Sequence, residues 1–388
     1  MSEYQYYEFQ AIDRKLTAAE MQALRALSSR ATITPASFVN EYNYGDFRGS
    51  PEALMEKYFD AHVYVANWGT HRLMLRLPRR LLDENSAKPY CAGHLAKARR
   101  ATKTSEFVIL EWSAEEESGG DWEEGGGWLA SLIPIRAELL GGDRSALYLG
   151  WLLGAQAGEL DDDDVEPEVP PGLARLSASL ERLAEFLRID PALIEVAAEV
   201  MPAHEKEEDG GALRVWIAAL PSTKKDEYLR RLVEGDDPHL RPELIQAFQR
   251  AGAAGRVGKR SAAPARRTVA ALLATAKERG EANQRAAATR EVKALAAREQ
   301  KEARAKKKRL DALVKDETSA WRRVDALIAK TDHDDAVALL VDLRDLAARE
   351  GQSSAFMARL DALRSQHKTR QALLRRINKA GLRSPAGA

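Results

Sequence analysis

The sequence of 388 residues contains a single cysteine, Cys91, and seven histidines that occur singly. One thiol cannot form an intramolecular disulfide or a zinc site with several cysteines, and this usage is typical of a reducing compartment. No apolar run approaches the roughly 18 residues of a membrane span, and the N-terminus MSEYQYYEFQ does not resemble a signal peptide. We therefore expect a cytoplasmic protein without a membrane partner.

The sequence also lacks the common catalytic motifs. It contains no G-x-x-x-x-G-K-[ST], no G-x-G-x-x-G after a strand, no H-E-x-x-H and no G-x-S-x-G. No catalytic residue, cofactor or metal site is predicted, and a non-catalytic protein is favoured over an enzyme. Two metal-like patterns have simpler interpretations. Cys91 and His94 have no second pair of ligands, and the carboxylates of Asp332–Asp335 precede a helix, whose N-terminus favours acidic residues.

The formal net charge is zero, but the two halves of the chain carry opposite charge. Residues 1–210 contain 21 Lys and Arg against 37 Asp and Glu, whereas residues 211–388 contain 38 against 22. Such a separation indicates that the halves attract each other, or that the basic half meets an external polyanion. Two solvated surfaces of different composition are the third interpretation.

The pattern of residues 1–113 predicts an α+β domain with a small sheet. Strands are expected at 4–12, 34–42, 62–67, 71–77 and 107–112, and capped helices at 17–28 and 51–59. A basic cluster lies near Trp68 and comprises His71, Arg72, Arg76, Arg79 and Arg80. These side chains could hold phosphates, but the favoured interpretation is the solvated outer face of an antiparallel strand.

The remainder is predicted to be predominantly α-helical. The expected parts are a helical domain at 128–250, a basic linker at 251–265, a long charged helix at 266–330 and C-terminal helical hairpins at 331–382 that resemble tetratricopeptide repeats. Glu281–Lys330 contains no Gly or Pro, and no large apolar residue occurs between Leu295 and Leu310. Because this stretch has no apolar face to bury, it is expected to be solvated or bound to a polar partner. Beyond it, apolar residues recur at helical spacing, as in a coiled coil.

The C-terminal segment WRRVDALIAKTDHDDAVALLVDLRDLAAREGQSSAFMARLDALRSQHKTRQALLRRINKAGL resembles a helical region carried by some bacterial proteins of the SWIM zinc-finger group. The resemblance covers Trp321–Leu382. The C-x-C and C-x-H ligands of the finger are absent, so the resemblance implies no zinc site. It points towards systems associated with nucleic acid.

Two functions follow as hypotheses. The first is an adaptor that binds nucleic acid non-specifically through phosphate contacts. Its predicted contact residues are Lys259, Arg260, Arg266, Arg267, Lys301, Arg304, Lys306, Lys307, Lys308 and Arg309. The second is a protein-interaction scaffold whose long helix is a spacer. Its predicted partner-binding residues are Trp321, Leu339, Leu343, Phe356 and Leu360. A solvated single helix stabilised by i,i+4 ion pairs is the alternative to both.

Overall fold

The computed structural model describes residues 4–100, 102, 105–115, 124–199, 210–235, 237–256 and 266–382. The chain divides into two compact units, Met1–Asn283 and Gln284–Ala388. The first contains the sheet and the helices that cover it, and the second is helical. None of the described helices combines the length and apolar character needed to cross a bilayer.

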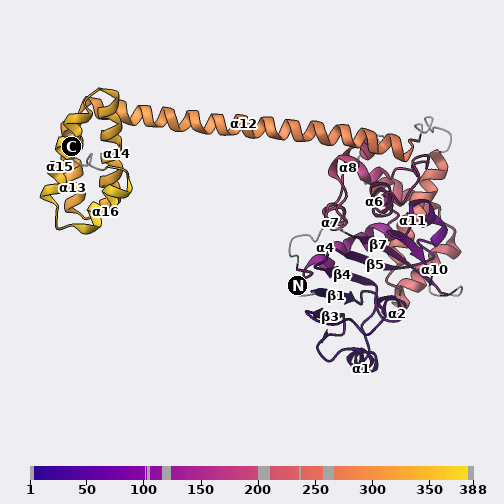
Figure 1. The fold of residues 1–388 in the computed structure, drawn as a ribbon. Helices are drawn as coiled ribbons and strands as arrows, with labels where there is room; N and C mark the ends of the chain where they lie inside the picture. Colours follow the sequence, from indigo (N-terminus) through magenta and orange to yellow (C-terminus); the bar gives the residue numbers. More distant parts are fainter. Residues whose placement is uncertain are drawn as a thin grey trace. The chain divides into compact units, whose positions relative to one another are not determined.

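The first unit is built on an antiparallel sheet of seven strands (Figure 1). The strands are β1 (Gln5–Gln10), β2 (Thr32–Ile33), β3 (Ser37–Tyr42), β4 (Ala61–Ala66), β5 (His71–Pro78), β6 (Ala96–Arg99) and β7 (Phe107–Ala114). Their order across the sheet is β2-β3-β1-β4-β5-β7-β6. The predicted hairpin is confirmed, because β4 pairs with β5 across the turn at Gly69, whose φ of 95° suits glycine.

Helices cover one face of this sheet. They are α4 (Trp128–Leu132), α5 (Pro134–Leu140), α6 (Ser145–Gln156), α7 (Ala178–Phe186) and α8 (Pro191–Ala198). The short helix α3 (Glu84–Ala87) and the 3₁₀ turn η1 (Lys88–Tyr90) connect β5 to β6, and the 3₁₀ turn η2 (Pro171–Ala174) lies between α6 and α7. Leu73, Leu75 and Leu77 of β5 share one apolar core with these helices. Gly150 lets α6 approach the sheet closely, because a Cβ there would lie 2.5 Å from Nε1 of Trp112. The core is therefore continuous from strand to helix.

The second face of the sheet is also covered. It packs on α1 (Ala18–Leu27) and α2 (Pro51–Lys57) through a core that contains Phe9, Phe38 and Met74. The predicted caps of both helices are confirmed, because Thr17 and Glu20 form a capping box and Ser50 accepts a hydrogen bond from the backbone N–H of Ala53. The expectation of a solvated outer face on β5 was wrong, since the sheet is buried on both sides.

Three further helices, α9 (Gly210–Ala219), α10 (Ser222–Glu234) and α11 (Leu240–Arg256), belong to the same unit. Polar contacts attach α11 to the rest of the unit, because Gln246 donates hydrogen bonds to the carbonyls of Leu81 and Leu140. The first turns of α12 (Val269–Lys315) complete the large core with Val269, Leu272 and Ala276.

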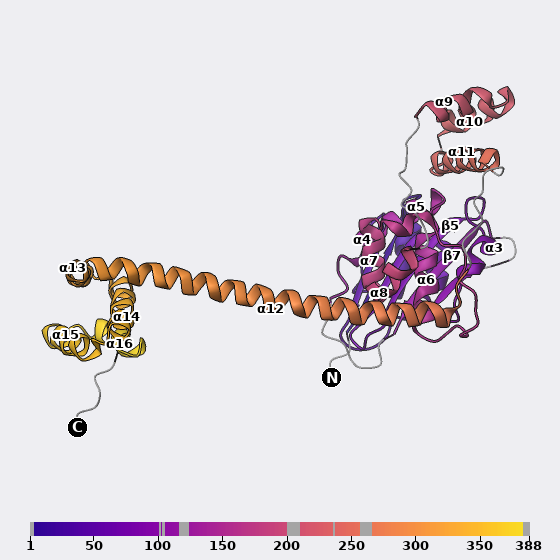
Figure 2. The same cartoon turned by 90° about the horizontal axis from the view of Figure 1, so that it is seen from above.

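The second unit contains α12 from Gln284 onward and four shorter helices (Figure 2). These are α13 (Glu317–Ala329), α14 (His333–Arg349), α15 (Ser353–Gln366) and α16 (Gln371–Lys379). Helix α14 contacts α13, α15 and α16, and the four share a core. The predicted uninterrupted helix over 266–330 was wrong. Helix α12 ends at Lys315, because Asp316 leaves the helical conformation. The Asp316 side chain instead caps α13 by accepting a hydrogen bond from the backbone N–H of Ser319.

Several domain boundaries differ from the sequence prediction. The break expected between residues 113 and 128 does not separate two cores, because the helices from Trp128 to Ala198 pack on the sheet. The linker expected at 251–265 begins as helix, since α11 extends to Arg256, and residues 257–265 lie outside the described chain. The C-terminal bundle begins before residue 331, because Trp321 and Val324 of α13 belong to its core.

Candidate nucleic-acid interface

The candidate interface is the part of α12 that belongs to the second unit. Every side chain from Gln284 to Arg309 is exposed. These residues include ten Lys and Arg against three Glu. A helix segment without a buried side contributes no apolar packing to its own unit, so its charged side chains determine what it can bind.

The charges of this segment are separated on the helix surface. Successive residues of an α-helix are rotated by about 100° around its axis, and on this basis five cations fall within an arc of about 80°. We call this set the cationic stripe, and its members are Arg290, Lys293, Lys301, Arg304 and Lys308. The three acidic residues Glu291, Glu299 and Glu302 fall within a similar arc on the opposite side. The stripe extends over about 27 Å of helix axis at ~1.5 Å per residue.

None of the stripe side chains has a hydrogen-bond or ion-pair partner among the residues that the structure describes. The nearby Arg298 lies outside the stripe and pairs with Glu302 at 3.1 Å, one turn along the helix. This i,i+4 ion pair, which stabilises the helix, therefore lies on its acidic side and not on the side of the stripe. Within the described chain, no carboxylate forms an ion pair with the stripe.

Two other cations of α12 form ion pairs with α14 of the C-terminal bundle. Lys306 Nζ lies 2.5 Å from a carboxylate oxygen of Asp345, and Arg309 Nε lies 3.3 Å from one of Asp342, both on α14. Burial opposes ionisation of Asp345, but hydrogen bonds from Lys306 and Arg344 outweigh it and lower the pKa of this carboxyl. Lys306 and Arg309 thus attach α12 to α14, and they project from the side of α12 away from the stripe.

The structure divides the residues predicted to bind nucleic acid. Arg266, Lys301, Arg304, Lys307 and Lys308 are exposed, whereas Lys259 and Arg260 lie outside the described residues. Arg267 is unsuitable because its guanidinium pairs with the buried carboxylate of Glu166 at 2.7 Å and donates to the carbonyl of Val196. Sequence reasoning missed Arg290 and Lys293, although their helical spacing from Lys301 would have shown the common face.

The residues predicted to bind a protein partner lie in the C-terminal bundle. Trp321, Leu343, Phe356 and Leu360 are buried in its core, and Leu339 packs against that core. Their role is to hold α13, α14 and α15 together, so they offer little surface to another chain. Exposed apolar side chains occur instead on α9 and α10, with Val215, Leu232 and Val233 at 71%, 66% and 85% exposure.

The basic cluster on β5 is neutralised inside the first unit. Arg72 pairs with Glu52 and Glu111, and Arg76 pairs with Asp60 at 2.8 Å. His71 is buried, and its Nδ1 lies 2.7 Å from the carbonyl oxygen of Phe186. These side chains cannot reach an external phosphate.

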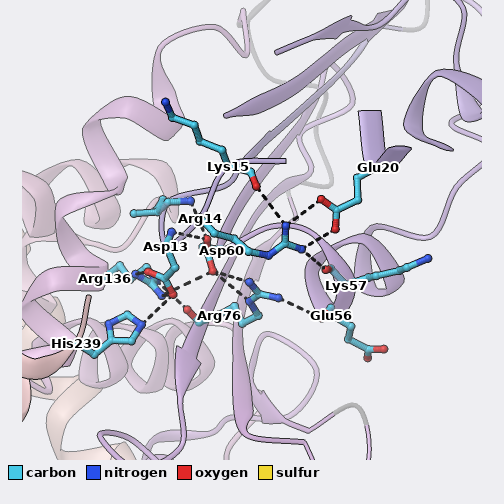
Figure 3. A network of polar contacts seen from close by, with 11 residues as sticks. Asp13, Arg14, Lys15, Glu20, Glu56, Lys57, Asp60, Arg76, Arg136 and His239 are labelled. Carbon is cyan, nitrogen blue, oxygen red and sulfur yellow. Dashed lines mark hydrogen bonds and ion pairs between the residues drawn. The ribbon is translucent and has the colours of Figure 1, made fainter. Parts of the chain in front are cut away.

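A buried network extends from Arg76 (Figure 3). Asp60 is fully buried and accepts hydrogen bonds from Arg76 and from the backbone N–H groups of Ile12 and Asp13. The Asp13 carboxylate receives two bonds from Arg136 and lies 2.9 Å from Nε2 of His239. Burial raises the pKa of Asp13, but the bonds from His239 and Arg136 outweigh it and lower the pKa to about 2. The network joins the sheet to α5 and to the start of α11.

No group of His, Cys, Asp and Glu in the described part of the chain is arranged to hold a metal ion. His94 pairs with Glu159 at 3.1 Å, and Asp334 and Asp335 lie in the first turn of α14. Asp332 makes no capping hydrogen bond. The predicted stabilisation of the N-terminus of α14 by acidic residues therefore comes from Asp334 and Asp335 in its first turn.

Comparisons with protein families, with curated proteins and with solved structures find no match for this chain. The resemblance of the C-terminal segment to the SWIM zinc-finger group stays a prediction.

Proposed function

We propose that this chain is a non-catalytic adaptor that binds nucleic acid through the cationic stripe of α12. The observation that supports the proposal is the separation of charge in the exposed segment 284–309, with five cations that lack partners among the described residues on one side and three Glu on the other. Phosphate neutralisation by Lys and Arg releases condensed counterions and requires no base recognition. The expected binding is strong at low salt and has little sequence preference.

The proposal places the protein in the cytoplasm. A chain with one cysteine cannot form an intramolecular disulfide, and such low cysteine usage is typical of a reducing compartment. Lys307 and Arg266 are secondary contributors. Lys307 borders the stripe, whereas Arg266 is exposed in the first unit. Binding of phosphates through the second unit leaves the first unit available for other contacts, which is the arrangement expected of an adaptor.

The test compares two triple charge reversals in the full chain. The stripe variant is Lys301→Glu, Arg304→Glu and Lys308→Glu. The control is Arg322→Glu, Arg323→Glu and Lys330→Glu, which changes two exposed residues of α13 and its exposed C-cap residue by the same total charge. Lys306 and Arg309 are left intact because their loss would disturb the contact with α14.

The readout is fluorescence anisotropy of labelled single-stranded and duplex oligonucleotides with nuclease-treated protein. At about 0.1 M salt, removal of three phosphate contacts should weaken binding roughly 100-fold or more, equally for different sequences. The control should retain most of the affinity. Equal losses in the two variants would show that only the overall charge matters, and absence of binding at low salt would disprove the proposal. In that case the scaffold hypothesis is left, and pull-down of a protein partner becomes the next experiment.

A further inference from the structure

The first unit contains a pocket lined by several arginines. It has a volume of about 390 Å³ and lies between the segment that follows β5, the turn between α5 and α6, and α11. Arg79, Arg80, Arg144 and Arg250 contribute guanidinium groups, whereas Asp83 is the acidic residue in the lining. A hollow of this size is within the range that accommodates small ligands.

Two of these arginines are already neutralised. Arg79 pairs with Glu84 at 3.1 Å. Arg80 pairs with Asp237 at 2.6 Å and with Glu243 at 3.3 Å. These contacts hold the rim of the pocket in place, and they leave the binding of an anion to the other two side chains.

Arg144 and Arg250 have no ion-pair partner among the residues that the structure describes. Arg250 donates to the neutral amide oxygen of Gln246 at 2.9 Å. Nη1 of Arg144 is buried and lacks a hydrogen-bond partner within the described chain. Burial lowers the pKa of Arg144 and outweighs the opposite effects of Tyr90, Asp143 and Asp83, and the charge of Arg250 acts in the same direction as burial. Two cations that repel each other across a pocket, one with an unsatisfied buried donor, form an incomplete site.

We propose that this pocket binds the phosphoryl group of a small phosphorylated ligand or of a nucleic-acid end between Arg144 and Arg250. Guanidinium groups present paired N–H donors that match phosphate oxygens, and a bound anion would offset the repulsion between the two cations. The left-handed turn at Gly142, with φ of 94°, forms the wall beside Gln249. The site lies in the first unit and does not depend on the cationic stripe.

The test is calorimetric titration of the full chain with inorganic pyrophosphate at low salt. The variant is Arg144→Gln with Arg250→Gln, and the control is Arg48→Gln, an exposed arginine outside the pocket. We expect binding by the wild type and the control, and at least a tenfold loss in the double variant. The melting temperature of the double variant without ligand should equal or exceed that of the wild type, because an unpaired, partly buried charge has been removed.

Competition experiments in the stripe variant identify the source of the phosphoryl group, since α12 no longer attracts oligonucleotides there. Displacement of pyrophosphate by a 5′-phosphorylated oligonucleotide, and not by its 5′-hydroxyl counterpart, would assign the site to nucleic-acid ends. Displacement by nucleotides alone would assign it to small metabolites, and either result supports the site. Absence of pyrophosphate binding, or equal binding by the double variant, would overturn it.

Discussion

The arginines of the sheet and the cations of α12 are chemically alike but occur in opposite surroundings. Arg76 and Arg136 are buried and face the carboxylates of Asp60 and Asp13. The stripe residues Arg304 and Lys308 are exposed and lack partners in the described chain. The first group contributes to folding, because a buried charge is tolerated only when it is paired. The second group contributes nothing to packing.

The comparison shows that density of Lys and Arg in a sequence does not by itself indicate a binding surface. His71, Arg72 and Arg76 form as clear a cluster along the chain as Lys306–Arg309, yet their polar groups bind partners inside the protein. Lys306 and Arg309 are likewise paired with α14. What distinguishes the stripe is that Glu291, Glu299 and Glu302, the carboxylates of the exposed segment 284–309, fall on the opposite side of the helix. The following predictions test this contrast, beginning with the largest effect on stability.

Asp60→Asn should destabilise the protein by about 3–5 kcal/mol, because Arg76 would be left as a buried cation without its carboxylate. Urea denaturation followed by circular dichroism measures the change. The matched control is Glu234→Gln, which breaks the exposed pair with Arg230 and should cost at most about 1 kcal/mol. Similar effects of the two substitutions would contradict the assignment of the network to folding.

His62 should make stability depend on pH. It is fully buried against Phe9, with ring centroids 3.9 Å apart, and burial lowers its pKa to about 3. Below its unfolded pKa of ~6.5 the unfolded chain binds a proton that the folded protein excludes, so stability falls as the pH decreases towards 3. Between pH 6 and 4 the wild type should lose about 2–3 kcal/mol more than His62→Gln. Parallel stability curves for the two proteins would disprove this behaviour.

Asp345→Asn should cost about 1 kcal/mol or less, because its partner Lys306 is half exposed and solvent weakens the pair. The measurement is the urea midpoint of the full chain. Oligonucleotide affinity should not decrease, since this substitution removes a negative charge and leaves the stripe intact. A loss of affinity would show that the contact between α12 and α14 matters for binding.

Substitution of Lys301, Arg304 and Lys308 by Gln should change the free energy of unfolding by less than about 0.5 kcal/mol. The side chains are exposed and unpaired within the described chain, and Gln has a helix propensity close to that of Lys and Arg. The thermal melting curve checks this expectation. A clear destabilisation would mean that the stripe has a structural role.

Local signals in the sequence predicted the elements well where one segment determines its own conformation. Thr17 with Glu20 and Ser50 with Pro51 identified the starts of α1 and α2, because caps depend on neighbouring residues. Asp316 shows the limit of composition, since the absence of Gly and Pro did not prevent an aspartate from ending α12.

Long-range contacts were invisible in the sequence. The pairing of Arg267 with Glu166 and of Arg136 with Asp13 joins residues far apart in the chain, and no local pattern marks them. The same holds for the arginine pocket, because Arg144 precedes α6 whereas Arg250 lies in α11. The stripe was partly predictable, because Lys301, Arg304 and Lys308 follow helical spacing, but the roles of Lys306 and Arg309 required the position of α14.

The most direct test of the proposed function is the salt dependence of duplex DNA binding. If the five stripe cations each neutralise a phosphate, log K plotted against log salt should have a slope of about −4.5 for the wild type. The slope should fall to about −1.8 when Lys301, Arg304 and Lys308 are reversed, and it should stay near −4.5 in the Arg322, Arg323 and Lys330 control. Identical slopes in all three proteins, or no binding at low salt, would contradict the account.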